Sequence, residues 1–189
     1  MTELVLVRHG ETDWNIQGRF QGQSDPPLNE RGLAQARTLA LELAGEEVAA
    51  VYTSDLQRAR QTAEILAEAL GAPLRADLRL REIHQGVWEG MVMDDIRRRY
   101  PEEFAQRAAD PLASTPPGGE SVRRVQQRAL GVVSEISARH PDEEVVVVSH
   151  GLVLALIRIH FLGLSPSALW EAVPANARPD RIRVPAGGN

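Results

Sequence analysis

Two stretches of the sequence are alike, Leu4-Val5-Leu6-Val7-Arg8-His9-Gly10 and Val145-Val146-Val147-Val148-Ser149-His150-Gly151, because each is a short apolar run that stops at a His-Gly pair. Such a run, bounded by glycine, is typical of a strand buried on both faces of a parallel sheet. Ligands of open α/β sheets bind beyond the carboxyl ends of these strands. If the two strands are neighbours, His9 and His150 meet at one edge of the sheet. We therefore expect a two-histidine site, with Arg8 beside His9.

Size and composition restrict the possible functions. The 189 residues, 43% of them hydrophobic and 25% charged, suit a single domain over residues 1–189 with a flap inserted at about 84–117. The net charge of −5 argues against a nucleic-acid partner. The absence of cysteine excludes disulfides and thiolate metal sites. No signal peptide or long apolar run is recognisable, so we expect a cytoplasmic protein without a membrane segment.

Strand and helix patterns alternate along the first part of the chain. A helix is expected after the capping residue Asn29, and a strand at residues 49–53. A second helix ends at Gly71, and Ser54 and Asp55 are its expected caps. This alternation predicts a three-layer, doubly wound α/β fold, with a mostly parallel sheet and helices on both faces.

The pattern loosens after residue 77 and becomes regular again near residue 120. The elements expected there are a short strand at 80–83, helices at 93–100 and 102–109, a long helix at 122–136, a final helix at 152–162 and an edge strand at 181–184. The segment between 84 and 117 is an excursion from the sheet, which prolines and glycines close as a loop.

Five residues could together carry out one reaction: Arg8, His9, Arg58, Glu82 and His150. Phosphoryl transfer needs cationic donors around the phosphate oxygens, and arginine offers a planar fork that stays charged. A neutral histidine can act as a covalent nucleophile, and a carboxylic acid can protonate the leaving oxygen.

Five ordered blocks resemble the histidine phosphatase superfamily, which has the phosphoglycerate-mutase-like fold, and within it the smaller bacterial phosphatases. They are Leu6-Val7-Arg8-His9-Gly10-Glu11-Thr12 with Trp14-Asn15, Arg19-Phe20-Gln21-Gly22, Thr53-Ser54-Asp55-Leu56-Gln57-Arg58-Ala59, Leu80-Arg81-Glu82-Ile83 with Trp88-Glu89-Gly90, and Ser149-His150-Gly151. They extend over roughly residues 4–160. An isolated Arg-His-Gly tripeptide would be weak evidence, whereas five blocks in the family's order are specific.

The resemblance implies a role for each site residue. His9 would become phosphohistidine, and Glu82 would donate the proton, which we expect it to hold mainly in the substrate complex. Phosphate would be bound by Arg8, Arg58 and His150, the last as a charged donor. The other residues implied in substrate binding are Asn15, Gln21, Gly22 and Gly151. No metal and no cofactor are implied.

Several alternatives remain open at this stage. The same blocks occur in cofactor-dependent phosphoglycerate mutases, and a non-catalytic phospho-ligand binder would retain the fold. The expected partner is a small phosphomonoester substrate. The resemblance implies a broad-specificity or an α-ribazole-phosphate phosphatase. A homodimer is one expected oligomeric state. A role for His84 at the substrate mouth and the pairing of the 176–189 tail are undecided. We favour a phosphatase, because the short chain leaves little room for a flap that excludes water.

Overall fold

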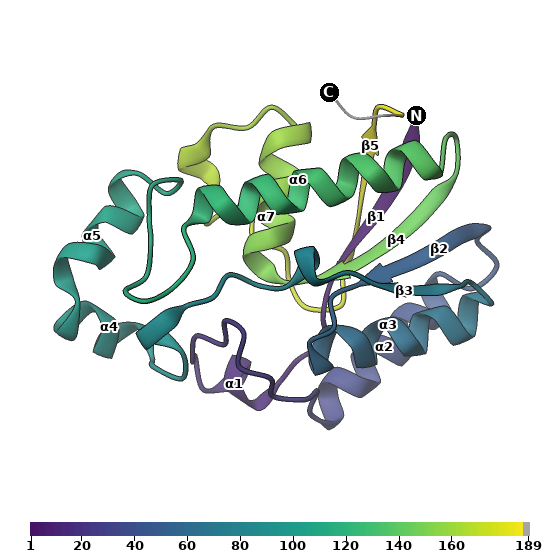
Figure 1. Cartoon of the computed structure of the whole chain (residues 1–189). Helices are drawn as coiled ribbons and strands as arrows, with labels where there is room; N and C mark the ends of the chain where they lie inside the picture. The colour runs from purple at the N-terminus through teal and green to yellow at the C-terminus, as the bar shows by residue number, and fades with distance from the viewer. Residues whose placement is uncertain (187–189) are drawn as a thin grey trace.

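A sheet with strand order β3-β2-β4-β1-β5 forms the centre of the computed structural model, which describes residues 1–186 (Figure 1). The strands are β1 (Thr2–Arg8), β2 (Val48–Thr53), β3 (Leu74–Ala76), β4 (Glu144–Ser149) and β5 (Pro179–Val184). Four strands are parallel, and β5 runs antiparallel to β1. The expected mostly parallel, doubly wound sheet is confirmed.

The pairing of β1 with β4 explains why both apolar runs are unbroken. The strands are in register from Glu3 opposite Glu144 to Arg8 opposite Ser149. Successive side chains point to opposite faces of the sheet, so a strand covered on both sides needs apolar residues at every position. Leu4 and Leu6 lie in one hydrophobic cluster, and Val5 lies in the cluster on the other face.

Helices cover both faces of the sheet (Figure 1). On one face, α2 (Glu30–Glu42) and α3 (Gln57–Leu70) pack against the cluster that contains Val5. On the other face, α6 (Val122–Arg139) and α7 (Gly151–Phe161) pack against the cluster that contains Leu4. The expected cap Asn29 accepts a hydrogen bond from the Gly32 amide at 2.8 Å.

The excursion from the sheet contains short helices, which lie at the left of Figure 1. These are α4 (Met93–Arg99) and α5 (Pro101–Ala109), preceded by the 3₁₀ helices η1 (Leu78–Leu80) and η2 (Gly86–Trp88). The remaining short helices are α1 (Asp13–Ile16), after β1, and η3 (Pro166–Ala168), after α7. Trp88 is buried and packs edge-on against Phe20. The excursion is thereby attached to the loop that follows β1.

Two local predictions are wrong. Residues 80–83 are not a strand, because Asp77 caps the 3₁₀ turn η1 and Leu80 and Ile83 both bury in the cluster under α6. The sheet is extended by β3 instead. Ser54 and Asp55 are not caps of α3: Leu56 is the N-cap and makes no side-chain bond there, and the Gln57 amide donates to the distant Asp25 at 2.6 Å.

The edge strand expected at residues 181–184 is present as part of β5. Its pairing, left undecided by the sequence, is with β1, with Thr2 opposite Val184. The Ala177 amide also donates to the Arg8 carbonyl at 2.8 Å. Residues 187–189 of the tail lie outside the described residues. Among the helices of residues 1–186, none combines the length and apolar character needed to cross a membrane.

Candidate active site

The parallel pairing of β1 and β4 brings the two histidines together. His9 follows β1 directly, and its amide donates to the Ser149 carbonyl at 3.0 Å. The centroids of the His9 and His150 rings are 5.3 Å apart, with 56° between the ring planes. Both side chains are buried, with exposed fractions of 3% and 0%. The sequence prediction of one two-histidine edge agrees with this geometry.

A cavity of about 190 Å³ opens over this edge. Its lining contains eight of the predicted residues: Arg8, His9, Asn15, Gln21, Gly22, Arg58, Glu82 and Gly151. His150 is not in the lining, and it lies against His9. Space at Gly151 is tight, because a Cβ there would come 3.0 Å from Cγ1 of Val173 and 3.6 Å from the Arg8 guanidinium.

His9 has the protonation state of a nucleophile. Its Nδ1 lies 2.7 Å from the Gly10 carbonyl oxygen, which can only accept, so Nδ1 carries the proton and Nε2 has the free lone pair. Burial lowers the pKa of His9 well below its ordinary value, and the nearby Arg58 and Arg8 lower it further. The ring is therefore neutral at pH 7, with Nε2 available to attack.

Arg58 enters the site from the first turn of α3 and is completely buried. Its two terminal nitrogens donate to the carbonyls of Ser24 and Gly22, each at 2.8 Å. Burial lowers the pKa of Arg58 to about 10, so the side chain remains cationic at pH 7. The loop after β1 is thus fastened to the base of the cavity by a charged side chain.

Three buried nitrogens at the site have no hydrogen-bond partner among the described residues. They are Nε of Arg8, Nε of Arg58 and Nδ1 of His150. A buried donor without a partner costs roughly 1–3 kcal/mol, and such atoms are rare in folded proteins. Around a neutral histidine and two cations, this set is suited to an anion with several acceptor oxygens.

His150 contacts Ser54, which we expected to cap a helix. Nε2 of His150 lies 2.7 Å from Oγ of Ser54, the expected helix cap. Burial, followed by the Arg58 charge, lowers the pKa of His150 well below its ordinary value. This shift favours a neutral ring in the free protein, and the expected charged donor stays a prediction. A neutral ring still donates through Nδ1 if the Ser54 hydroxyl donates to Nε2.

Glu82 is positioned by backbone groups. Its carboxylate oxygens accept from the amide of Ile83 at 3.0 Å and from the amide of Leu152, in the first turn of α7, at 3.2 Å. Its carbonyl accepts from Arg128 at 3.1 Å and from Gln23 at 3.2 Å. The carboxylate of Glu82 is thereby held at the lining of the cavity that contains His9.

Three residues that follow β1 and were predicted to bind substrate differ in what they can offer a ligand: Asn15, Gln21 and Gly22. Asn15 uses its Oδ1 to cap α1, accepting from the Thr12 amide at 3.0 Å, which leaves its NH₂ group for the cavity. Gln21 is buried, and its Oε1 has no partner among the described residues. Gly22 uses its carbonyl to hold Arg58, so a phosphate contact from Gly22 could only involve the amide.

Sequence reasoning missed several residues that line the cavity. They are Arg19, Phe20, Gln85, Arg107, Leu152, Trp170 and Val173. Arg19 and Phe20 stand in a quoted block, which could have identified them. Arg107 and Trp170 carry no local signal, because they come from the excursion and from the segment after α7 and meet only in the folded chain.

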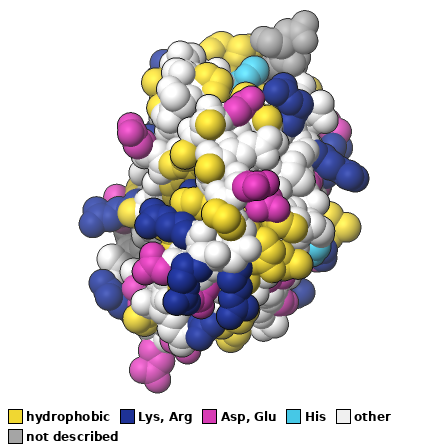
Figure 2. All heavy atoms as spheres, turned by 90° about the vertical axis from the view of Figure 1, so that its left-hand side faces the viewer, with side chains coloured by type: hydrophobic (Ala, Val, Ile, Leu, Met, Phe, Trp, Pro, Cys, Tyr) yellow, Lys and Arg dark blue, Asp and Glu magenta, His cyan; other side chains and the backbone are white. Residues whose placement is uncertain are grey.

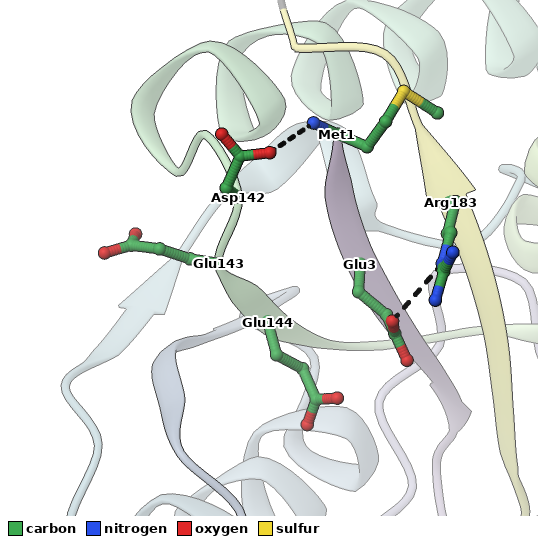
Figure 3. Close-up of a pocket in the computed structure, with 6 residues that line it drawn as sticks. All are labelled: Met1, Glu3, Asp142, Glu143, Glu144 and Arg183. Carbon is green, nitrogen blue, oxygen red and sulfur yellow. Dashed lines mark hydrogen bonds and ion pairs between the residues drawn. The ribbon is translucent and has the colours of Figure 1, made fainter.

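His84 does not line this cavity. It lines the neighbouring cavity together with Arg81 and Arg124, and its Nε2 is 3.8 Å from Glu89. A larger cavity of about 390 Å³ lies near the N-terminus and contains mainly carboxylates (Figure 3). Charges there are partly paired: the amino group of Met1 contacts Asp142 at 2.7 Å. Among the described residues, the cavity near the N-terminus is lined by one arginine and no histidine, whereas His84 in the other cavity is half exposed, with 48% of its side chain accessible, and faces a carboxylate.

No group of three or more histidine, aspartate and glutamate side chains within residues 1–186 is arranged to hold a metal ion. The unpartnered buried nitrogens of the cavity region, as far as residues 1–186 show, belong instead to Arg8, Arg58 and His150.

Comparison with known proteins gives a consistent result. The model of the family described as "Histidine phosphatase superfamily (branch 1)" matches residues 4–189. Phosphoserine phosphatase 1 of Hydrogenobacter thermophilus is 39% identical over 171 residues, which are 90% of this chain and 81% of the relative. The probable phosphoglycerate mutase GpmB of Serratia proteamaculans is 38% identical over 165 residues, covering 87% of this chain and 76% of the relative. The solved structure of Bacillus stearothermophilus YhfR has a TM-score of 0.90 and 41% identity, over 100% of this chain and 94% of that one.

Proposed function

Since the chain belongs to the histidine phosphatase superfamily and is a phosphatase of that family, we propose that it hydrolyses small phosphomonoesters through a phosphohistidine on His9. One observation carries this proposal. Buried nitrogens of Arg8, Arg58 and His150, which have no partner among the described residues, lie around a neutral histidine whose Nδ1 carries the proton. A phosphate dianion would supply acceptors for all three nitrogens.

In the first half-reaction, Nε2 of His9 attacks phosphorus and the bond from phosphorus to the ester oxygen breaks. Glu82, protonated in the complex, gives its proton to the departing oxygen, so the alcohol leaves neutral. Arg8 and Arg58 stabilise the charge on the phosphoryl oxygens. The two arginines supply this stabilisation, and no metal is required.

In the second half-reaction, the Glu82 carboxylate takes a proton from a water molecule whose oxygen attacks phosphorus. The bond between phosphorus and Nε2 then breaks, phosphate departs and His9 returns to its neutral state. Glu82 ends protonated, ready for the next substrate. The Gly10 carbonyl accepts from Nδ1–H throughout, which fixes the ring orientation in both steps.

The cavity supports a small substrate. Its volume of about 190 Å³ is below the roughly 300–1,000 Å³ of sites for drug-sized ligands. A phosphate with a few carbon atoms is therefore a better fit than a nucleotide. Action in the cytoplasm and a homodimer stay predictions.

Phosphoglycerate mutase is the second candidate function, since one relative above carries that name. The two activities differ in what accepts the phosphoryl group: water in a phosphatase and a second phosphorylated metabolite in a mutase. An assay with 3-phosphoglycerate, in the presence and absence of 2,3-bisphosphoglycerate, separates them by the product. Free phosphate identifies hydrolysis, and 2-phosphoglycerate identifies transfer.

The test of the proposed function is hydrolysis of p-nitrophenyl phosphate between pH 5 and 8 in the presence of EDTA. We expect turnover by the wild type and none by His9→Ala. The matched control is His160→Ala, which removes an exposed histidine whose ring contacts that of Phe161. Reaction samples quenched during turnover should contain an acid-labile phosphoprotein in the wild type and in the control. Full activity of His9→Ala would refute the proposal.

A further inference from the structure

Arg107 is a cation at the cavity without an acidic partner. It lies in α5, on the excursion, and it lines the same cavity as His9 and Glu82. Its guanidinium makes no hydrogen bond or ion pair within the described residues, and burial lowers the pKa of Arg107 to about 10, so it remains charged at pH 7. The phosphate end of the cavity already has Arg8 and Arg58, so Arg19 and Arg107 are further cations in the lining.

Aromatic rings hold this cation in place. Cζ of Arg107 lies 3.5 Å from the centroid of the Trp170 ring, 5.7 Å from that of Phe20 and 5.9 Å from that of Phe104. The indole N–H of Trp170 donates to the Arg107 carbonyl at 3.0 Å. A guanidinium stacked on an aromatic ring keeps its N–H groups free at the edge of its plane. This arrangement fixes the side chain and leaves its donors for a ligand.

Other arginines at the same surface have polar or acidic partners. Arg19 also lines the cavity, and it donates to the side chain of Gln17 at 2.8 Å and to the Gly90 carbonyl at 2.5 Å. Arg97, on α4, pairs with Asp94 at 3.7 Å. Figure 2, which faces the side of the molecule that carries α4 and α5, shows basic side chains beside hydrophobic ones. Arg107 differs from these neighbours because aromatic rings contact its guanidinium, and within residues 1–186 this group donates no hydrogen bond.

We propose that Arg107 binds a carboxylate on the substrate, so that the preferred substrates are small phosphomonoesters that also carry a carboxylate. The proposal rests on the proposed function. The planar fork of the guanidinium matches a carboxylate, and the small cavity places both anionic groups a few carbon atoms apart. Arg107 would therefore select the substrate, and it would take no part in the transfer of the phosphoryl group.

The experiment compares pairs of substrates that differ in the carboxylate alone or nearly so. The first pair is O-phosphoserine and O-phosphoethanolamine, and the second is 3-phosphoglycerate and glycerol 3-phosphate. For each pair, the ratio of the two kcat/KM values measures the contribution of the carboxylate. We expect the wild type to favour the carboxylate in at least one pair, and Arg107→Gln to reduce that ratio about 30-fold, the effect of losing a charge-assisted hydrogen bond. Arg107→Lys, which keeps the charge without the fork, should lie between the two.

The matched control is Arg97→Gln, since Arg97 stacks on the same Phe104 ring, 5.0 Å from its centroid, and does not line the cavity. The ratio should be unchanged in this variant. An equal loss on both members of a pair in Arg107→Gln would assign Arg107 a structural role and overturn the proposal. The proposal would also be overturned if the wild type shows no preference for the carboxylate in either pair. A third comparison, of fructose 1,6-bisphosphate with fructose 6-phosphate, would overturn it if the preference that depends on Arg107 is for a second phosphate.

Failure of the proposed function has a different signature. In that case the wild type would not release phosphate from p-nitrophenyl phosphate or from any member of the two pairs. If Arg107→Gln does not fold, as circular dichroism and thermal unfolding would reveal, the Arg107→Lys ratios decide: an unchanged preference overturns the proposal, and a reduced one supports it.

Discussion

Ser54 Oγ lies 2.7 Å from Nε2 of His150, and no other hydrogen bond to this ring exists among the described residues. Ser54 follows β2, whereas His150 follows β4, the strand beside it in the sheet. A hydroxyl that donates to Nε2 leaves the ring proton on Nδ1, the atom that has no partner. The tautomer of a histidine is set by the bond that its other nitrogen makes. We therefore expect Ser54 to act as a positioning residue for the proposed anion site.

Ser54→Ala should reduce kcat/KM for p-nitrophenyl phosphate about 10- to 100-fold, the usual effect of removing a partner that orients a site histidine. Without the hydroxyl, the ring proton can move to Nε2, and a lone pair on Nδ1 then faces the phosphate. The inhibition constant of inorganic phosphate should rise in parallel. Ser54→Thr keeps the hydroxyl and should recover part of the activity. Unchanged kinetics and unchanged phosphate inhibition in Ser54→Ala would contradict the assignment.

Glu82→Gln should lower turnover in a way that depends on the leaving group. An alkyl alkoxide is a strong base and needs a proton as it departs, whereas p-nitrophenolate leaves without help. We expect kcat/KM for an alkyl phosphate to fall about 10²- to 10⁴-fold, the usual contribution of general acid catalysis, and that for p-nitrophenyl phosphate to fall much less. Equal losses on the two substrates would indicate that Glu82 is not the proton donor.

Stability should decrease as the pH falls below about 6.5, the ordinary pKa of histidine. Burial lowers the pKa values of His9 and His150 in the folded protein, so in this range the unfolded chain binds more protons than the folded one. The free energy of unfolding then falls by up to about 1.4 kcal/mol per pH unit for each histidine, and the loss is absent above pH 6.5. Urea unfolding of the wild type and of His150→Gln between pH 5 and 7.5 measures this. Equal slopes in the two proteins would show that His150 makes no contribution.

Gly10→Ala and Gly131→Ala should change stability in opposite directions. A Cβ on Gly10 would lie 2.5 Å from the carbonyl oxygen of Gly32, in backbone that cannot easily move, so we expect a loss of about 1–3 kcal/mol. Gly131 is within α6, and a Cβ there meets no atom within 4 Å. Alanine at that position should raise the free energy of unfolding by about 0.5–1 kcal/mol. Urea unfolding of both variants tests the pair, and a stable Gly10→Ala protein would mean that the loop can shift.

The sequence by itself predicted β1, β2, β4 and β5, most helices and the residues that line the candidate phosphate site, but not β3. The apolar runs at residues 4–7 and 145–148 predict parallel neighbours, because only a strand covered on both faces needs apolar side chains at every position. The local signals were equally clear at Asn29 and Gly71, where capping groups act over a few residues. His9, Arg58 and Glu82 were identified because each stands in a recognisable block.

Only the tertiary structure decided what those residues touch. The sequence assigned Ser54 to a helix cap, but the fold places it against His150, and a carboxylate from the distant Asp25 accepts from the first amide of α3. Arg107 and Trp170 have no signal of their own, and they meet at the cavity because the excursion and the segment after α7 pack together. Helix caps and strand patterns depend on neighbours in the sequence, whereas protonation states, unpartnered donors and substrate contacts depend on groups that only folding brings together.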